Sequence, residues 1–107
     1  MPEFDHPLVP GARRVDDEAL RMMRDDQSLL QTVREAVQEL RRAFEQGEVD
    51  VEYFIDHDSD DLEERIYVAV YTSDSEPLER LRRVRRTWWQ RHPAYASAPM
   101  GLTVHAA

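Results

Sequence analysis

The stretch Ser75-Glu-Pro-Leu-Glu-Arg-Leu-Arg-Arg-Val-Arg-Arg-Thr-Trp-Trp-Gln-Arg-His92 organises the rest of this sequence. It holds six of the fourteen arginines and both tryptophans of a chain whose net charge is -8. Its apolar residues recur at helical spacing, at Leu78, Leu81, Val84 and Trp88, with Trp89 at the margin. The stretch therefore predicts one amphipathic helix that closes the core with one face and exposes positive charge on the other.

Both ends of this helix are marked in the sequence. Ser73, Asp74 and Ser75 offer N-cap side chains, and Pro77 follows where a first-turn proline is tolerated. Pro93 disfavours helical geometry at His92. The helix is therefore expected to end near Arg91.

Two more helices are predicted upstream. At about 100° per residue, one arc of a helical wheel holds Leu29, Leu30, Val33, Ala36, Val37, Leu40, Ala43 and Phe44. Leu20 falls on the opposite side of that wheel, so one unbroken helix would leave it stranded. We expect a short helix near 16–24 and a long one from about 27 to 46, capped by Asp25 or Asp26 and stopped by Gly47.

Two stretches alternate with the period of a half-buried strand, 49–56 and 64–72. The polar segment 57–61 between them predicts a hairpin loop, and therefore an antiparallel pair. A short last strand is expected from Gly101 to Ala106, after the arginine-rich helix. A strand-helix-strand crossover leaves its two strands parallel.

The expected fold is α+β: a three-stranded mixed sheet with helices on one face, like a ferredoxin-like fold that lacks its first strand. Residues 1–15 are expected to form an irregular arm, and 16–107 a single domain. Tyr67, Ala69 and Tyr71 give one sheet face less polarity than a free surface has. We expect the arm or a partner to cover that face. Exposed edges of so small a sheet also favour a homodimer.

Composition narrows the functional classes. Cysteine is absent, which excludes disulfides and catalytic thiols, and no apolar run approaches the roughly 20 residues that span a bilayer. The first residues lack the features of a secretory signal, so we expect a cytoplasmic protein without a membrane partner. A net charge of -8 disfavours general affinity for nucleic acid.

One family resemblance rests on the arginine-rich helix. A hairpin leads through Thr72-Ser73 into a helix with Leu78, Leu81 and Val84 spaced before Trp88-Trp89, and a loop and a short strand follow. This arrangement, over 26–104, resembles a family of small bacterial proteins in which a Trp-Trp pair ends the helix. Members of that family usually carry acidic residues where this chain has Arg85 and Arg86. The resemblance implies the fold and brings no established activity with it.

The arginines of this helix are the main candidate site, formed by Arg82, Arg83, Arg85, Arg86 and Trp89. Arg85 falls on the apolar arc, so its guanidinium must stay hydrated or find a carboxylate or an aromatic ring, with Trp89 the nearest candidate. The arginines could pair with this chain's own carboxylates, dock an acidic protein or a second protomer, or bind nucleic acid. Arginines beside aromatics can stack bases.

The sequence gives little support for a metal site or a cofactor site. Asp56 to Asp61 has alternating carboxylates, but positions six and twelve of a calcium loop would be Asp61 and Tyr67 instead of Gly and Glu. The four histidines, His6, His57, His92 and His105, lack metal-pair spacing, and the three glycines are isolated. We expect neither a metal site nor a cofactor.

These observations favour a non-enzymatic protein-interaction or regulatory module, which dimerises or neutralises a partner as an antitoxin or inhibitor does. The alternative is a binder of nucleic acid or a phosphate ligand, through Arg82, Arg83, Arg86 and Trp89. No residue pattern favours an enzyme.

Overall fold

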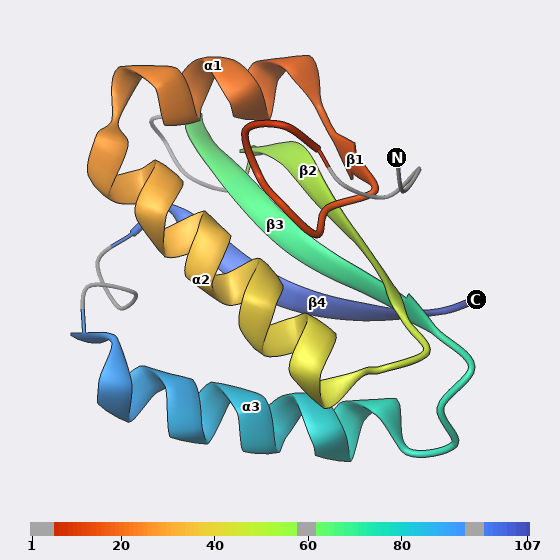
Figure 1. Ribbon diagram of the computed structural model, residues 1–107. Coiled ribbons are helices and arrows are strands. Elements are labelled where there is room, and N and C mark those ends of the chain that lie inside the picture. Colours follow the sequence, from red (N-terminus) through yellow and green to blue (C-terminus); the bar gives the residue numbers. More distant parts are fainter. Residues whose placement is uncertain (1–5, 58–61, 94–97) are drawn as a thin grey trace.

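The computed structural model describes residues 6–57, 62–93 and 98–107, with Trp89 described by its backbone alone. The elements follow one another as β1 (Arg14–Val15), α1 (Asp17–Asp25), α2 (Gln27–Ala43), β2 (Glu48–Asp56), β3 (Glu63–Thr72), α3 (Pro77–Arg91) and β4 (Met100–Ala106). Figure 1 shows the three helices as one layer in front of a twisted sheet. The α+β class and the placing of the helices on one face are confirmed.

The sheet has four strands where the sequence predicted three, in the order β1-β2-β3-β4. The predicted hairpin is confirmed as the antiparallel pair β2 and β3, and β4 lies parallel to β3. The extra strand β1 lies in the predicted irregular arm and pairs parallel with β2, Arg14 opposite Asp50. Two residues are too few for an alternating pattern, so the sequence could not reveal this strand.

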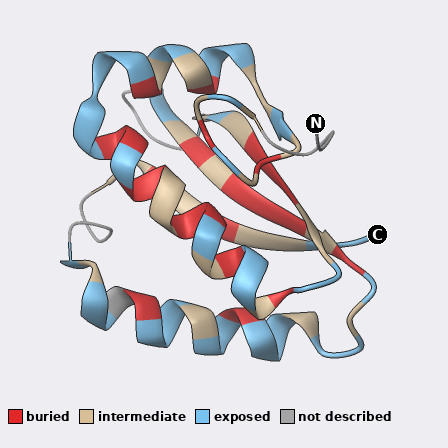
Figure 2. Cartoon of the chain, in the orientation of Figure 1, coloured by how far each residue is buried: buried red, intermediate tan, exposed pale blue. Residues whose placement is uncertain are grey.

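The core lies between the sheet and the helix layer. Inward-facing residues of the three long strands stand opposite one another, as Val51, Val68 and Leu102 do, and all three are fully buried. Each helix adds buried residues to the same cluster, among them Met23, Leu40 and Trp88. Figure 2 shows buried residues along the sheet-facing sides of the helices and along β3.

The predicted break between the first two helices is confirmed, and Asp26 is the residue that caps α2. Its side chain accepts a hydrogen bond from the Leu29 amide at 3.1 Å. The end of α2 differs from the prediction, because the helix ends at Ala43 and not near 46. Phe44 leaves the helical path and places its ring in the core, with 3% of its surface exposed.

The predicted extent of α3 is confirmed, but its N-cap and its apolar face differ from the prediction. The N-cap residue is Glu76, and Asp74 instead accepts a hydrogen bond from the Glu76 amide at 2.8 Å. Leu78 is 61% exposed and lies outside the core. At about 100° per residue, Pro77 points in the same direction as Leu81 and Trp88, and Leu78 points roughly 90° away from it. Pro77 therefore takes the inward position of the first turn.

The described part of the arm, residues 6–15, packs against α2. Val9 and Ala12 are fully buried. The carbonyls of this segment accept hydrogen bonds from α2 side chains, such as Arg34 Nε to the Leu8 oxygen at 2.9 Å. Gly11 has a φ of 95°, and a Cβ there would lie 2.8 Å from the Arg41 side chain. Most of this segment therefore lies with the helices. It reaches the face that bears Tyr67 and Tyr71 only through the Arg13 side chain, so the predicted covering of that face by the arm is confirmed at the Tyr71 end alone.

That face carries a hydrogen-bonded network around Tyr71. The Tyr71 hydroxyl donates to Glu52, and the Arg13 guanidinium lies 5.4 Å from the centre of the Tyr71 ring. Arg13 also forms ion pairs with Glu48 and, at 2.7 Å, with Asp50. The hydrogen bond to Glu52, followed by burial, raises the pKa of Tyr71 to about 12.

We expect Tyr71 to make the folded state sensitive to alkali. The unfolded chain loses this proton near its ordinary pKa of about 10, while the folded chain keeps it until about 12. Stability should therefore fall as the pH rises from 10 to 12, more steeply in the wild type than in Tyr71→Phe. Urea unfolding at pH 9 and at pH 11 measures the difference, and Tyr67→Phe is the control. An equal loss of unfolding free energy between pH 9 and pH 11 in all three proteins would contradict this assignment.

Candidate functional site

A furrow runs along the seam between α2 and α3, which lie antiparallel. Contacts across it join Arg80 Nη1 to the Ala43 oxygen at 3.2 Å, Arg91 Nη2 to Glu39 at 2.8 Å, and His92 Nδ1 to Glu35 at 2.9 Å. Three adjoining hollows of about 460, 330 and 390 Å³ follow this seam, and Arg42 lines all of them. We call it the α2–α3 furrow, and its charged lining comprises Arg34, Glu35, Glu39, Arg42, Glu45, Asp74, Arg80, Arg83, Arg91 and His92.

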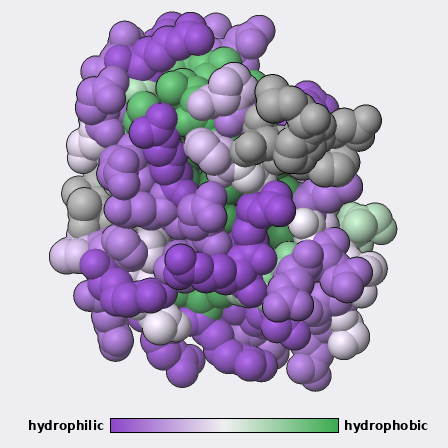
Figure 3. Space-filling model, viewed as in Figure 1, coloured by the Kyte–Doolittle hydropathy of each residue, from purple (hydrophilic) through white to green (hydrophobic). Residues whose placement is uncertain are grey.

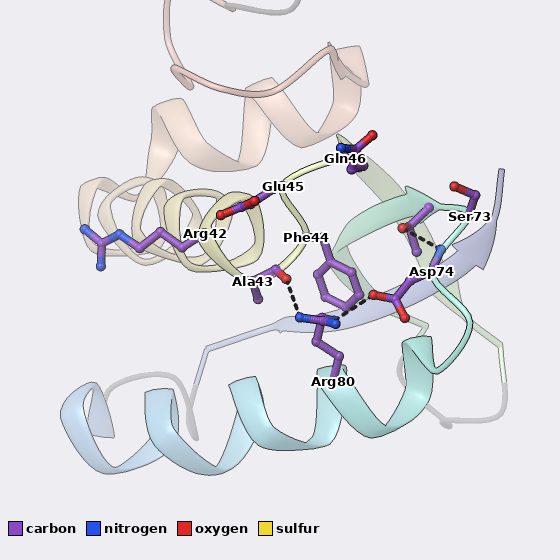
Figure 4. Close-up of a pocket in the computed structure, with 9 residues that line it drawn as sticks. Arg42, Ala43, Phe44, Glu45, Gln46, Ser73, Asp74 and Arg80 are labelled. Carbon is purple, nitrogen blue, oxygen red and sulfur yellow. Dashed lines mark hydrogen bonds and ion pairs between the residues drawn. The ribbon is translucent and has the colours of Figure 1, made fainter.

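The largest hollow lies at the end of the furrow where β3 leads into α3 (Figure 4). Arg80 lies between α2 and the β3–α3 loop there, with its guanidinium 5.9 Å from the centre of the Phe44 ring and 2.7 Å from Asp74. The Glu76 amide, together with the charge of Arg80, lowers the pKa of Asp74. A cation beside the last carbonyls of a helix is favoured by the helix dipole. Arg80 therefore joins elements of the scaffold, whereas Arg42 points away from it in Figure 4.

The predicted site residues on α3 have three different environments. Arg82 pairs with Glu79 at 2.9 Å on the same helix. Arg85 donates a hydrogen bond to the Leu102 carbonyl of β4, so the backbone of the sheet receives its guanidinium. Arg83 and Arg86 are exposed, and neither forms an ion pair with a residue that the structure describes. The predicted role of the Trp89 side chain lies outside the described residues.

The furrow also contains residues that sequence reasoning missed. Arg34, Glu35, Glu39 and Arg42 come from α2, where they belong to the polar side of a helix. Arg91, the last residue of α3, reaches across the seam to Glu39 and was not among the predicted site residues. Their spacing on α2 could have indicated a shared face, yet only the antiparallel packing of the two helices brings that face to α3.

Charge is strongly segregated in this molecule. The α3 segment contains six arginines and one acidic residue, Glu79, which gives it a net charge of +5. Since the whole chain carries -8, the remainder carries -13. Figure 3, which views the helix side, shows a mainly hydrophilic surface over α2 and α3. The basic surface of α3 is therefore local, and not a property of the whole protein.

The described residues offer few alternatives to this surface. Within 6–57, 62–93 and 98–107, no group of three or more His, Asp or Glu side chains is placed to hold a metal ion. Most of the predicted acidic loop, Asp58 to Asp61, lies outside those ranges. No helix in the described part of the chain is both long and apolar enough to cross a membrane.

Comparison with known proteins adds no relative to this picture. No protein-family model, no curated protein and no solved structure matches the chain. The resemblance to small bacterial proteins with a Trp-Trp pair stays a prediction, and any assignment of function depends on the geometry alone.

Proposed function

We propose that this protein is a non-enzymatic binding module that docks an acidic segment of a partner protein on α3 and the α2–α3 furrow. The observation that carries the proposal is the state of Arg83 and Arg86, two exposed cations without an ion-pair partner among the described residues. They stand on the one helix that is strongly basic, in a chain with 22 acidic residues. Guanidinium groups suit this role because their planar forks bind carboxylates through paired hydrogen bonds.

The furrow beside these arginines favours a polypeptide over a nucleic acid. Glu35 and Glu39 lie in its lining and hold His92 and Arg91. A phosphate backbone needs a continuous cationic track, and a charge of -13 on the rest of the chain would repel a long polyanion. A short acidic segment would contact only the basic surface of α3 and would stay clear of the acidic remainder of the chain. Such docking would let this protein regulate its partner, in the cytoplasmic setting that the sequence predicts.

Binding is proposed over catalysis because the polar groups at the centre of the largest of the three hollows, Thr72, Asp74 and Arg80, are engaged with one another. Arg80 pairs with Asp74, and Asp74 accepts from the Glu76 amide. The buried Thr72 hydroxyl accepts from the Asp74 amide at 3.1 Å. No histidine lines this hollow, so its hydroxyls lack the usual general base.

Fluorescence anisotropy with a labelled deca-glutamate peptide tests the proposal at low salt. Arg86→Glu is expected to weaken binding about tenfold or more, which is roughly 1.4 kcal/mol, because it removes one ion pair and adds a repulsion. Arg24→Glu is the matched control, since Arg24 is also exposed on a helix and has no ion pair with a described residue. It should leave the affinity nearly unchanged.

Three outcomes would contradict the proposal. They are no peptide binding at low salt, equal losses in the two variants, and tighter binding of a single-stranded oligonucleotide of the same charge. The last outcome would favour the alternative of a nucleic-acid or phosphate-ligand binder on α3.

A further inference from the structure

The sheet face opposite the helices is covered by no helix or strand that the structure describes, and only the Arg13 side chain lies over one end of it, beside Tyr71. It forms a second surface, separate from the α2–α3 furrow. Outward-facing positions alternate with the buried ones along β2, β3 and β4. We call this surface the open face, defined by Glu48, Asp50, Glu52, Phe54, Arg65, Tyr67, Ala69, Tyr71, Gly101, Thr103 and His105. A half-polar sheet face of this kind is usually left to water, but here its centre is aromatic.

The open face is flat because its two central tyrosines lie along the sheet. A Cβ added to Gly101 would meet the Tyr67 ring at 2.9 Å, so the glycine makes room for that ring. Tyr71 stands opposite Glu48, yet its hydroxyl reaches Glu52, four residues further along β2. The ring must therefore lie across the row that contains Ala69 and Asp50. This ring, together with the Arg13 side chain that binds Asp50, accounts for the low exposure of Ala69 and Asp50, 0% and 5%.

Further rings extend this aromatic surface to both ends. The edge of Phe54 packs against Tyr67, with ring centres 5.5 Å apart and planes at 70°. His105 stacks on Tyr71 with ring centres 5.0 Å apart and planes at 24°. Phe54 remains 48% exposed, one of the few large apolar side chains of the described chain that the core does not take up.

Charges of opposite sign lie at opposite ends of the open face. Arg65 stands opposite Phe54 at one end, and Glu48 stands opposite Tyr71 at the other. Arg65 forms no ion pair with a described residue. Arg13 is the one described cation paired with Glu48 and Asp50, and Glu52 adds a third carboxylate, so this end keeps a net negative charge. A two-fold axis perpendicular to the strands exchanges the two ends, so Arg65 of each copy meets the net negative end of the other. We propose that the open face is a homodimer interface, occupied by a second copy of this chain packed sheet to sheet.

The size of the open face determines how strong this dimer can be. With strands about 4.8 Å apart and about 3.3 Å per residue, three strands of 7 to 10 residues cover roughly 450 Å² per copy. Two copies then bury about 900 Å², which is below the roughly 1,600 Å² of a standard interface. The dimer is therefore expected to belong to the weak, reversible class of interfaces.

A second copy fits this surface better than a nucleic acid does. The rings could stack bases, but the row on β2 presents Glu48, Asp50 and Glu52 to the same side. Three carboxylates beside the rings would repel the phosphates of a bound strand. A second copy brings Arg65 toward two of these carboxylates instead.

Sedimentation equilibrium of the full chain over the micromolar range tests the interface. Phe54→Glu is expected to raise the dissociation constant at least tenfold, because it removes an exposed ring of the interface and places a carboxylate against Tyr67. Leu78→Glu is the matched control, since Leu78 is another exposed large apolar residue, on α3, at 61% against 48% for Phe54. It should leave the dimer intact. Circular dichroism of both variants shows whether each keeps the fold.

Each other outcome overturns the proposal. Wild-type protein that stays monomeric throughout the micromolar concentration range would show that no such dimer forms. A dimer that Leu78→Glu dissociates and Phe54→Glu leaves intact assigns the contact to the helix side. Wild-type protein that stays monomeric while an oligonucleotide quenches tyrosine fluorescence, an effect lost in Phe54→Glu, assigns the open face to nucleic acid.

Discussion

Trp88→Ala is expected to lower the free energy of unfolding by about 3–5 kcal/mol. Trp88 is fully buried and is the largest of the fully buried side chains of the described chain. It belongs to the cluster that joins α3 to the sheet, and its ring also contacts His92 with ring centres 5.5 Å apart. Truncation leaves a cavity that neither the helix nor the sheet can close, because both are held by other contacts.

Thermal unfolding followed by circular dichroism measures this loss, with Arg86→Ala as the control. Arg86 is exposed on the same helix, and its removal should change stability by no more than about 0.5 kcal/mol. A Trp88→Ala protein that melts with the control would show that the tryptophan is a surface platform and not part of the core.

Arg13→Met is expected to cost about 2–4 kcal/mol of stability, which makes it the second largest effect. Arg13 donates hydrogen bonds to both carboxylate oxygens of Asp50, at 2.9 Å and 2.7 Å, and pairs with Glu48. The Asp50 side chain is only 6% exposed, so loss of the arginine leaves a buried carboxylate without its cation. Breaking a fully buried pair costs about 3–5 kcal/mol, and the partial exposure of Arg13 reduces this somewhat.

A second substitution separates the charge effect from loss of packing. In the Arg13→Met background, Asp50→Asn removes the uncompensated charge and should recover part of the stability. Arg14→Ala is the control, because Arg14 is well exposed and its ion pair with Asp16 is long, at 3.9 Å. Urea unfolding at pH 7 measures all four proteins. If Asp50→Asn deepened the loss, the buried charge would not be its cause.

The elements of the fold were largely predictable because each long segment has a clear period and marked ends. Asp26 caps α2 and Pro77 begins α3 as expected, and the alternation of β2 and β3 fixed the hairpin. Strand β1 escaped because its pairing depends on backbone hydrogen bonds from Arg13 and Asp16 to β2, which no side-chain pattern records. Leu78 was wrongly assigned to the apolar face, because a helical wheel gives the spacing of residues along α3 but not the direction in which the sheet lies.

The candidate site was predictable only in part. The arginines of α3 stood out by composition, and Arg83 and Arg86 are exposed as expected. Their neighbours Arg42 and Glu39 come from α2, about forty residues away in sequence, and only the packing of the helices brings them together. The open face depends in the same way on register, because Tyr71 reaches Glu52 across a strand boundary.

The hydrogen bond from Arg85 to Leu102 has a consequence for aggregation. β4 ends the sheet, and the open side of a terminal strand is a template on which another chain can add by backbone pairing, the first step toward fibrils. The Leu102 carbonyl is already occupied by a charged group that α3 supplies. An incoming strand would have to displace this guanidinium and bury charge beside it. A residue that seemed misplaced on the apolar arc of its helix thus works as a gatekeeper against aggregation.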